Sequence, residues 1–450
     1  MNRILFRAVF AAALGGLLFG FDIAVISGTT QTIKQTFALS EWGMGLTVAS
    51  ALWATALGAL MSGSIVEHLG RRAGLRIAGW LFLISAAGCA VAWDWWSLVV
   101  FRAIGGLGVG AASVMCPMYI AEISPARLRG RLVLVFQLNI VLGILVAYLS
   151  NALITPFNLG LEEWRWKLGV ECVPALVFLL ALIGIPQSPR WLAKRGRLSE
   201  TRQVLVRIRE PDPDTRLAEI HRTVAEQPSE PLLQMKYRKP ILLGLSLLFF
   251  NCMAGINAVL YYLNDTFESA GFSRADSDRG AVIIGFMNFA FTVVAMFLID
   301  KAGRRTLLLI GAVGMAPCLA ALAAILHLHQ FQYLLVWILA GYIASFAISQ
   351  GSVVWVYVSE IFPNRVRGRG EALSSFFGMT LGAATANVFP AMREWSAPLT
   401  FLFFAAMVVL QFFVVWRYYP ETKGVTLEEM QRRLGIVDEV PGESPNSKVK

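Results

Sequence analysis

Three charged residues stand inside long apolar stretches of this 450-residue sequence. Asp22 lies in the otherwise uncharged run from Ala8 to Gly28, Arg102 opens a run of small residues, and Glu171 interrupts an apolar segment. A charge in the middle of a membrane-spanning helix costs about 2.5–3.5 kcal/mol, so acids and bases there pair with one another and mark proton or ion paths. A carboxylate that binds a proton releases its cationic partner. We therefore predict a functional site at these charges; a structural ion pair, or a helix cap at Asp22, is the alternative.

The composition predicts that these residues belong to a membrane protein. Hydrophobic residues make up 56% of the chain and charged residues only 15%, and the mean hydropathy is +0.61. A helix needs about 20 apolar residues to cross the hydrocarbon core. We expect an all-α membrane protein with twelve transmembrane helices, at about 8–29, 46–66, 74–92, 96–119, 132–152, 166–185, 240–264, 279–299, 306–326, 332–358, 371–392 and 397–417.

The net charge of +10 follows a membrane pattern. If both termini are cytoplasmic, 32 of the 39 Lys and Arg residues lie on the inner side and six, including Lys167, lie on the outer side. The remaining one, Arg102, lies within a span. This asymmetry is the positive-inside pattern, and it accounts for the basic balance without nucleic acid. The five cysteines lie in apolar runs and the four histidines are scattered, so we expect neither a metal site nor a cofactor.

The chain also repeats itself. EISPARLRGR at 122–131 recurs as EIFPNRVRGR at 360–369, an offset of 238 (360 − 122), and EHLGRR at 67–72 recurs as DKAGRR at 300–305, an offset of 233 (300 − 67). Two motifs at nearly one offset indicate two parallel halves with a binding site between them. We expect an N-terminal half at 1–186, a cytoplasmic helical linker at 187–239, a C-terminal half at 240–419 and a cytoplasmic tail at 420–450.

Two motifs for nucleotides are absent or weak. GGLGVG at 105–110 lacks the spacing and the preceding strand of a dinucleotide site, and Gly106 and Gly110 are instead spaced for close helix packing. The sequence contains no Gly-Lys-Ser or Gly-Lys-Thr, which excludes a P-loop pump on this chain.

An ordered set of motifs resembles the sugar porter family of the major facilitator superfamily, and within it the proton-coupled monosaccharide symporters. The set runs through essentially the whole chain: GGLLFGFDIAVISG (15–28), GSIVEHLGRR (63–72), RAIGGLGVG (102–110), EISPARLRGR, PQSPRW (186–191), AGIN followed by VLYY (254–262), DKAGRR, SEIFPNRVRG and PETKG (420–424). The resemblance implies alternating access, with Asp22, Arg102 and Glu171 as the proton-coupling residues. Facilitative relatives have an amide at the position of Asp22, so the acid favours symport.

The resemblance also implies sugar contacts and cytoplasmic gates. The matching sugar-contact positions are Phe19, Gln137, Asn251, Asn257, Tyr261, Gly351 and Trp355. Polar side chains in apolar spans also bond between helices, which is the alternative for Gln137 and Asn257, and Trp355 could instead pack as an interface aromatic. The gating positions are Glu67, Arg71, Arg72, Glu122, Arg129, Asp300, Arg304, Arg305, Glu360 and Arg367.

Several sugar-reading positions depart from the family pattern. Asn251 and Cys252 replace paired glutamines, Gly378 and Met379 replace a Gln-Trp pair, and Gln350 and Ser352 flank Gly351 in place of Trp and Pro. Sites that bond hydroxyl groups discriminate through such side chains, so another sugar, a polyol or a sugar acid is open as substrate.

We therefore expect a monomeric, multi-pass carrier of the inner (plasma) membrane that couples protons to a monosaccharide or polyol. An uncoupled uniporter or exchanger is the first alternative, and a non-transporting sugar sensor is the second. An enzyme is not expected, because no cluster of nucleophile, base and orienting residue can be assembled.

Overall fold

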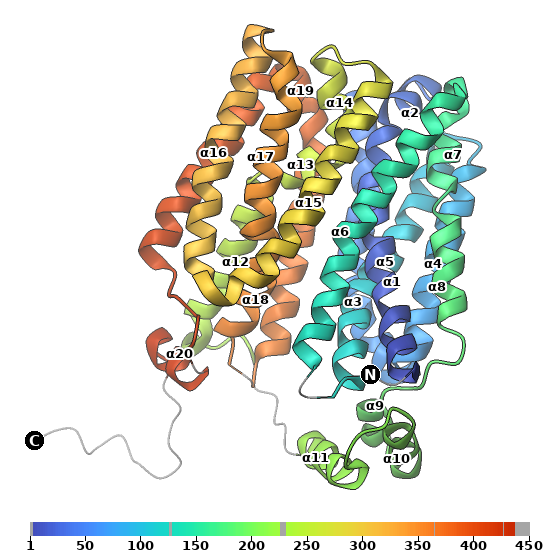
Figure 1. The fold of residues 1–450 in the computed structure, drawn as a ribbon, viewed down its shortest axis with the longest axis vertical. Coiled ribbons are helices and arrows are strands. Elements are labelled where there is room, and N and C mark those ends of the chain that lie inside the picture. Colours follow the sequence, from blue (N-terminus) through green and yellow to red (C-terminus); the bar gives the residue numbers. More distant parts are fainter. Residues whose placement is uncertain (1–2, 126–127, 226–230, 364, 426, 437–450) are drawn as a thin grey trace, which may run out of the picture.

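The computed structural model describes residues 3–125, 128–225, 231–363, 365–425 and 427–436, which form helices and no strand (Figure 1). The helices before the linker are α1 (Arg3–Val25), η1 (Ile26–Gly28), α2 (Thr30–Thr36), α3 (Glu41–Leu69), α4 (Arg71–Ala90), α5 (Trp95–Ile123), α6 (Arg129–Ile154), η2 (Thr155–Phe157), η3 (Gly160–Glu162), α7 (Glu163–Gly169) and α8 (Cys172–Ala181). The linker holds α9 (Pro189–Lys194), α10 (Leu198–Arg207), α11 (Pro213–Ala225) and η4 (Met235–Tyr237).

The remaining helices form a second bundle and a terminal helix. They are α12 (Arg238–Met253), α13 (Ile256–Tyr261), α14 (Leu263–Ser269), α15 (Arg274–Ala302), α16 (Arg304–Leu328), η5 (Gln332–Leu334), α17 (Leu335–Ile348), α18 (Gln350–Ile361), α19 (Arg367–Tyr418) and α20 (Leu427–Leu434). The predicted cap of α20, Thr426, and the predicted disordered end from Pro441 lie outside the described residues.

Ten helical segments of the described chain are long and apolar enough to span a membrane. One of them, α19, has 52 residues and a non-helical residue at Ser396, and it contains two of the predicted spans. Pro398 lies just after that residue; it lacks a backbone donor and disfavours helix before it. The predicted span 166–185 is divided between α7 and α8, each shorter than a span. All twelve predicted stretches therefore correspond to helical chain.

Glycines allow the helices of the first half to pack closely. A Cβ on Gly143 of α6 would lie 2.0 Å from the Leu17 carbonyl oxygen of α1, and one on Gly106 of α5 would lie 2.0 Å from the Ala51 carbonyl oxygen of α3. Gly110 meets the Thr55 carbonyl in the same way at 2.1 Å. No side chain fits at these distances, which confirms the close packing predicted for the 106–110 pair.

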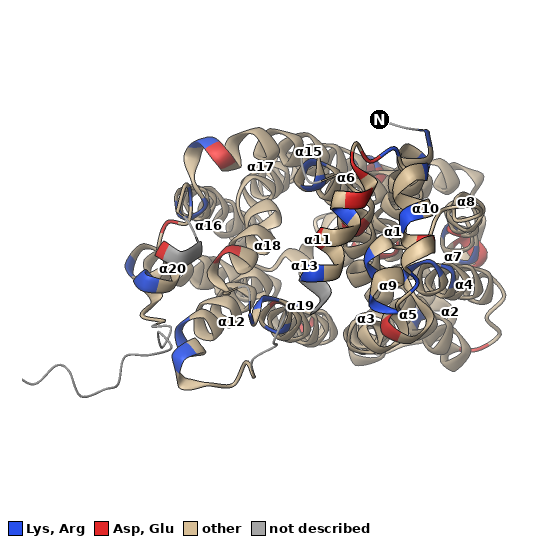
Figure 2. Cartoon of the chain, turned by 90° about the horizontal axis from the view of Figure 1, so that it is seen from below, with Lys and Arg blue, Asp and Glu red and all other residues tan. Residues whose placement is uncertain are grey.

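Two bundles lie side by side in Figure 1, α1–α8 (the N half) and α12–α19 (the C half). Across their boundary α3 packs on α19, and α6 packs on α15. Helices α9–α11 and α20 lie at one end, which we call the linker end, and α2, α7 and α14 lie at the opposite, distal end (Figure 1). Seen from the linker end, Lys and Arg lie on the short helices and at the near ends of the long ones (Figure 2).

Candidate functional site

The first predicted pair forms a buried ion pair in the middle of the N half. Arg102 of α5 donates from Nη1 to Asp22 Oδ1 of α1 at 2.9 Å. The two residues are only 2% and 6% exposed. Arg102 Nε and Nη2 are buried and have no hydrogen-bond partner among the described residues. A buried guanidinium with spare donors depends on its one carboxylate, so the charge state of Asp22 controls whether Arg102 is compensated.

Glu171 lies close to this pair but is not part of it. The residue is 4% exposed and stands at the break between α7 and α8. Within the described chain it forms no ion pair with Arg102, although all three charges interact electrostatically. The break lies between Gly169, a weak helix former, and Pro174, which has no backbone N–H to continue the α-helical hydrogen bonds; the Val170 carbonyl instead accepts from the Val173 N–H at 3.0 Å. The structure therefore places the three predicted coupling residues in one buried cluster, with a single direct contact.

The C half reaches this cluster through a broken helix. Gly255, with φ +84°, separates α12 from α13, and a Cβ there would lie 2.7 Å from Phe404. The left-handed backbone and the close neighbour both require glycine. The break turns α13 so that Tyr261 is buried and interacts electrostatically with Asp22 and Arg102.

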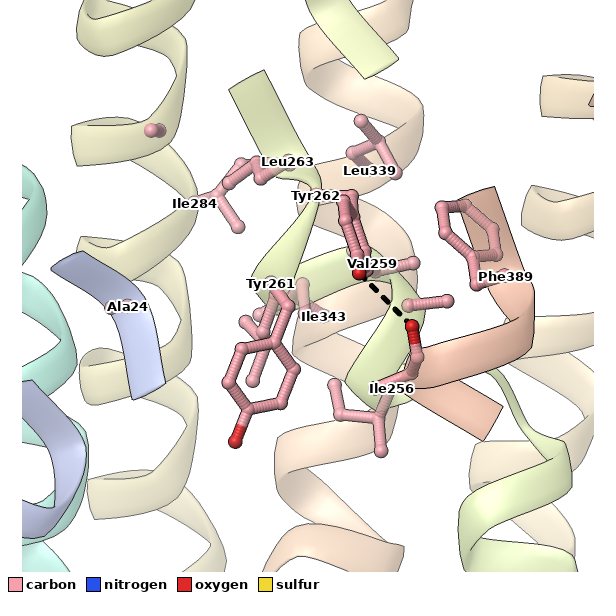
Figure 3. Close-up of a cluster of buried hydrophobic side chains, with 14 of the residues drawn as sticks. Ala24, Ile256, Val259, Tyr261, Tyr262, Leu263, Ile284, Leu339, Ile343 and Phe389 are labelled. Carbon is pink, nitrogen blue, oxygen red and sulfur yellow. Dashed lines mark hydrogen bonds between the residues drawn. The ribbon is translucent and has the colours of Figure 1, made fainter. Parts of the chain in front are cut away.

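Packing around α13 fixes this position. Figure 3 shows its side chains between Ala24 of α1, Ile284 of α15 and Phe389 of α19. The Tyr262 hydroxyl donates to the Ala386 carbonyl of α19 at 3.0 Å (Figure 3). The Tyr148 hydroxyl of α6 donates to the Leu260 carbonyl at 3.0 Å, so α13 is also tied to the N half.

The predicted sugar-contact residues come from helices of both halves. Gln137 of α6 donates to the Gly351 carbonyl of α18 at 3.5 Å, which is a long bond across the boundary. The Asn257 amide of α13 lies 2.7 Å from where a Cβ of Gly382 in α19 would be, so a larger residue at 382 would displace it. The other predicted contacts are the half-buried Phe19 and Asn251 and the 46% exposed Trp355.

The departing positions have partners of their own. The Cys252 thiol donates to the Gly378 carbonyl at 3.3 Å. The Gln350 amide donates to Gln411 Oε1 of α19 at 2.5 Å, and Gln350 Oε1 and Gln411 Nε2 are buried without a partner in the described chain. Gln350 is thus engaged inside the C half.

The predicted gating residues form two matched clusters at the linker end. Arg71 binds Glu122 through two bonds of 2.8 Å, and Arg304 binds Glu360 through bonds of 3.1 and 2.9 Å. Each pair is internal to one half: the Arg71 pair to the N half and the Arg304 pair to the C half. The remaining contacts are Glu67 with Lys194 of α9 at 2.8 Å, Asp300 with Arg304 at 3.1 Å, Arg305 with the Trp416 carbonyl, and Arg367 with the Phe362 carbonyl at 3.4 Å. The Nε atoms of Arg72 and Arg129 are buried and have no hydrogen-bond partner in the described chain.

A polar network at the distal end was not predicted. Lys167, counted from the sequence as an outer-side residue, is a buried residue of α7 that contacts Glu163 and Asp278. Thr30 and Gln31 donate to Asp265 of α14 at 2.7 and 2.9 Å. Helical spacing was the available signal for the Glu163–Lys167 pair, because these residues are four apart and share a face of one helix.

Burial changes the acids of this network. It raises the pKa of Glu268, at the distal end of α14, to about 7, and it raises the pKa of Asp265 above its ordinary value. No three His, Cys, Asp or Glu residues of the described chain are placed to hold a metal ion.

The family model for sugar (and other) transporters matches residues 8–434. The chain is 37% identical over 437 residues to a probable metabolite transport protein of Bacillus subtilis, covering 94% of this chain and 93% of that protein. It is 35% identical over 473 residues to the D-xylose-proton symporter of Escherichia coli, covering 96% of each.

A solved structure agrees with the sequence comparison. The xylose transporter of Escherichia coli in a partially occluded inward-open conformation has a TM-score of 0.86 and 33% identity, with 94% of this chain and 100% of that chain covered. The predicted all-helical fold with two parallel halves is confirmed by this likeness.

Proposed function

This chain belongs to the sugar transporter family of the major facilitator superfamily, and from that membership we propose that it carries a monosaccharide or related polyol across a membrane together with a proton. It works by alternating access. Its family and relatives are transporters, not enzymes. The observation that carries the coupling is the buried Asp22–Arg102 pair beside the C-half helix α13.

Asp22 accepts the proton. The carboxylate lies 2.9 Å from Arg102 Nη1, and protonation would remove the charge that compensates the guanidinium. Arg102 then lacks its charged partner, and Glu171 is another buried carboxylate that interacts with it electrostatically. The change in pairing moves α1 relative to α5 and biases the carrier toward its other conformation.

The substrate lies between the halves, next to α13. Gln137 and Asn257 supply amide donors and acceptors from opposite halves, and Asn251 adds a shorter amide from α12. Phe19, Tyr261 and Trp355 supply aromatic faces, and the Gly351 carbonyl accepts a bond. The Cys252 thiol bonds to the Gly378 carbonyl and the Gln350 amide bonds to Gln411, so these donors are used inside the C half. This supports a substrate with fewer hydroxyl contacts in the C half than xylose or glucose.

The arrangement of the chain follows from this role. We place the protein in a bacterial inner (plasma) membrane, with the linker end and both termini on the cytoplasmic side. The functional unit is a monomer surrounded by lipid. The segments 1–186, 187–239, 240–419 and 420–450 act as N half, linker, C half and tail. The linker-end ion pairs of Arg71 and Arg304 change partners as that end opens and closes.

Uptake into proteoliposomes tests the proposal. Purified protein is supplied with labelled sugars and polyols, with and without an inward proton gradient. Accumulation that requires the gradient is expected for the symporter. Equilibration without accumulation would instead identify a uniporter or exchanger, and binding without uptake would identify a sensor.

A further inference from the structure

Three charged side chains are buried together at the distal end, away from the Asp22 cluster. Lys167 Nζ of α7 lies 2.5 Å from Glu163 Oε1 and 3.4 Å from Asp278 Oδ2 of α15, and it donates to the Gly28 carbonyl at 3.0 Å. The side chains of Lys167, Glu163 and Asp278 are 2%, 6% and 3% exposed. One cation thus compensates two carboxylates from opposite halves.

Each charge also has a partner within its own half. Glu163 and Lys167 are one turn apart on α7 and stay together whatever α15 does. Asp278 accepts from Asn264 Nδ2 of α14 at 2.6 Å, inside the C half. Around these charges the halves are joined by Lys167 to Asp278, Thr155 to Asp278, and Ser27 to Asn264 at 3.1 Å, and Thr30 and Gln31 join them nearby through Asp265. If the halves separate at this end, Glu163 and Lys167 still pair with each other, and Asp278 still accepts from Asn264.

This pattern distinguishes a reversible contact from a permanent one. A buried ion pair contributes little net stability, because desolvation offsets the Coulomb attraction, but loss of one partner leaves a costly buried charge. Here water enters as the distal end opens, and the partners within each half remain. A contact of this kind can break and form again at little net cost in free energy.

We propose that Lys167 is a gating residue that holds the distal end closed by bridging Glu163 and Asp278, and so sets the balance between the two conformations of the carrier. The proposal rests on the alternating-access function proposed above. It assigns to this end of the protein a charged latch separate from the ion pairs of the linker end.

The geometry predicts that the two partners are not equivalent. Lys167→Met leaves the Glu163 and Asp278 carboxylates buried together without a cation, so the closed state is disfavoured by about tenfold or more. Asp278→Asn leaves the Glu163–Lys167 pair, which has no net charge, so the loss of closed-state population is several times smaller. Lys167→Arg keeps the charge and restores most of the closed population.

Spin-label distances across the distal end measure this balance. Labels are attached to Leu161→Cys and Tyr333→Cys, which are exposed positions of the N and C halves. The partly exposed native cysteines, Cys172 and Cys318, are replaced by serine. The long-distance population is expected to grow in the order wild type, Asp278→Asn, Lys167→Met. The matched control is Lys34→Met, which removes a distal-end cation paired with Glu41 inside the N half.

Transport kinetics give a second measurement that a purely structural role would not produce. A larger outward-open fraction lowers the half-saturation constant for external substrate, while slower closure lowers the maximal rate. Lys167→Met is therefore expected to lower both constants. Unchanged distances in Lys167→Met and Asp278→Asn would overturn the latch, as would an equal response to Lys34→Met. Because distances are read without substrate, failure to find a transported sugar contradicts the proposed function and not the latch.

Discussion

Replacing Asp22 with asparagine removes one charge and keeps the shape of the side chain. The asparagine Oδ1 can still accept from Arg102 Nη1, which lies 2.9 Å from Asp22 Oδ1 in the wild-type protein. The site can no longer bind and release a proton, because an amide does not titrate in the working range. We expect the variant to lose proton-driven accumulation and to keep substrate exchange.

The structure sets the size of both effects. Loss of one member of a buried ion pair costs about 3–5 kcal/mol, and the retained hydrogen bond to a charged donor returns about 1.5–3 kcal/mol. The folded state should therefore lose about 1–3 kcal/mol and survive. For transport, one coupled proton and a gradient of one pH unit are worth about 1.4 kcal/mol, which supports about tenfold accumulation. In the variant the ratio of internal to external substrate should remain about one.

Paired assays in proteoliposomes separate coupling from folding. Accumulation is measured under an imposed proton gradient, and exchange is measured with substrate on both sides and no gradient. The matched control is Asp94→Asn, which changes an N-terminal cap of α5 to another good cap. If Asp22→Asn still concentrates substrate when the gradient is applied, Asp22 is not the proton acceptor.

Three further predictions concern packing, buried polarity and pH. Gly143→Ala forces a Cβ to within 2.0 Å of a carbonyl of α1, so unfolding in detergent should show a loss of about 2 kcal/mol or more, and a wild-type melting curve would contradict the packing. Gln350→Leu should cost about 1–3 kcal/mol by leaving Gln411 unpaired, whereas the double replacement of both by leucine should be nearly neutral; equal losses would refute the pairing. The raised pKa of Glu268 means that its contribution to the stability of the folded protein is present below pH 4.5 and is lost as pH rises through about 7, so melting temperatures from pH 4.5 to 8 should fall less in Glu268→Gln than in wild type.

The helical fold and its two halves followed from features that act along the chain. Apolar stretches of spanning length form helices because the bilayer core offers no partners for backbone groups, and the repeated motifs at 122 and 360 placed two equivalent bundles side by side. The charges at Asp22, Arg102 and Glu171 stood out because each is costly in an apolar helix. The close approach at Gly106 and Gly110 was also visible, since only glycine permits that contact.

The partners of these residues depended on tertiary structure. Spacing along the chain does not tell which of two acids Arg102 contacts, and the folded helices place Asp22 within bonding distance and Glu171 farther away. From the sequence, Lys167 is an ordinary outer-side charge, and only the folded structure shows that Asp278 of α15 lies against it. Gln350 in sequence is an amide beside a glycine, and only the packing of α18 on α19 pairs it with Gln411. A sequence alone therefore determines which groups are too costly to leave alone in the membrane, because that cost is local, whereas the approach of distant helices decides which group compensates each of them.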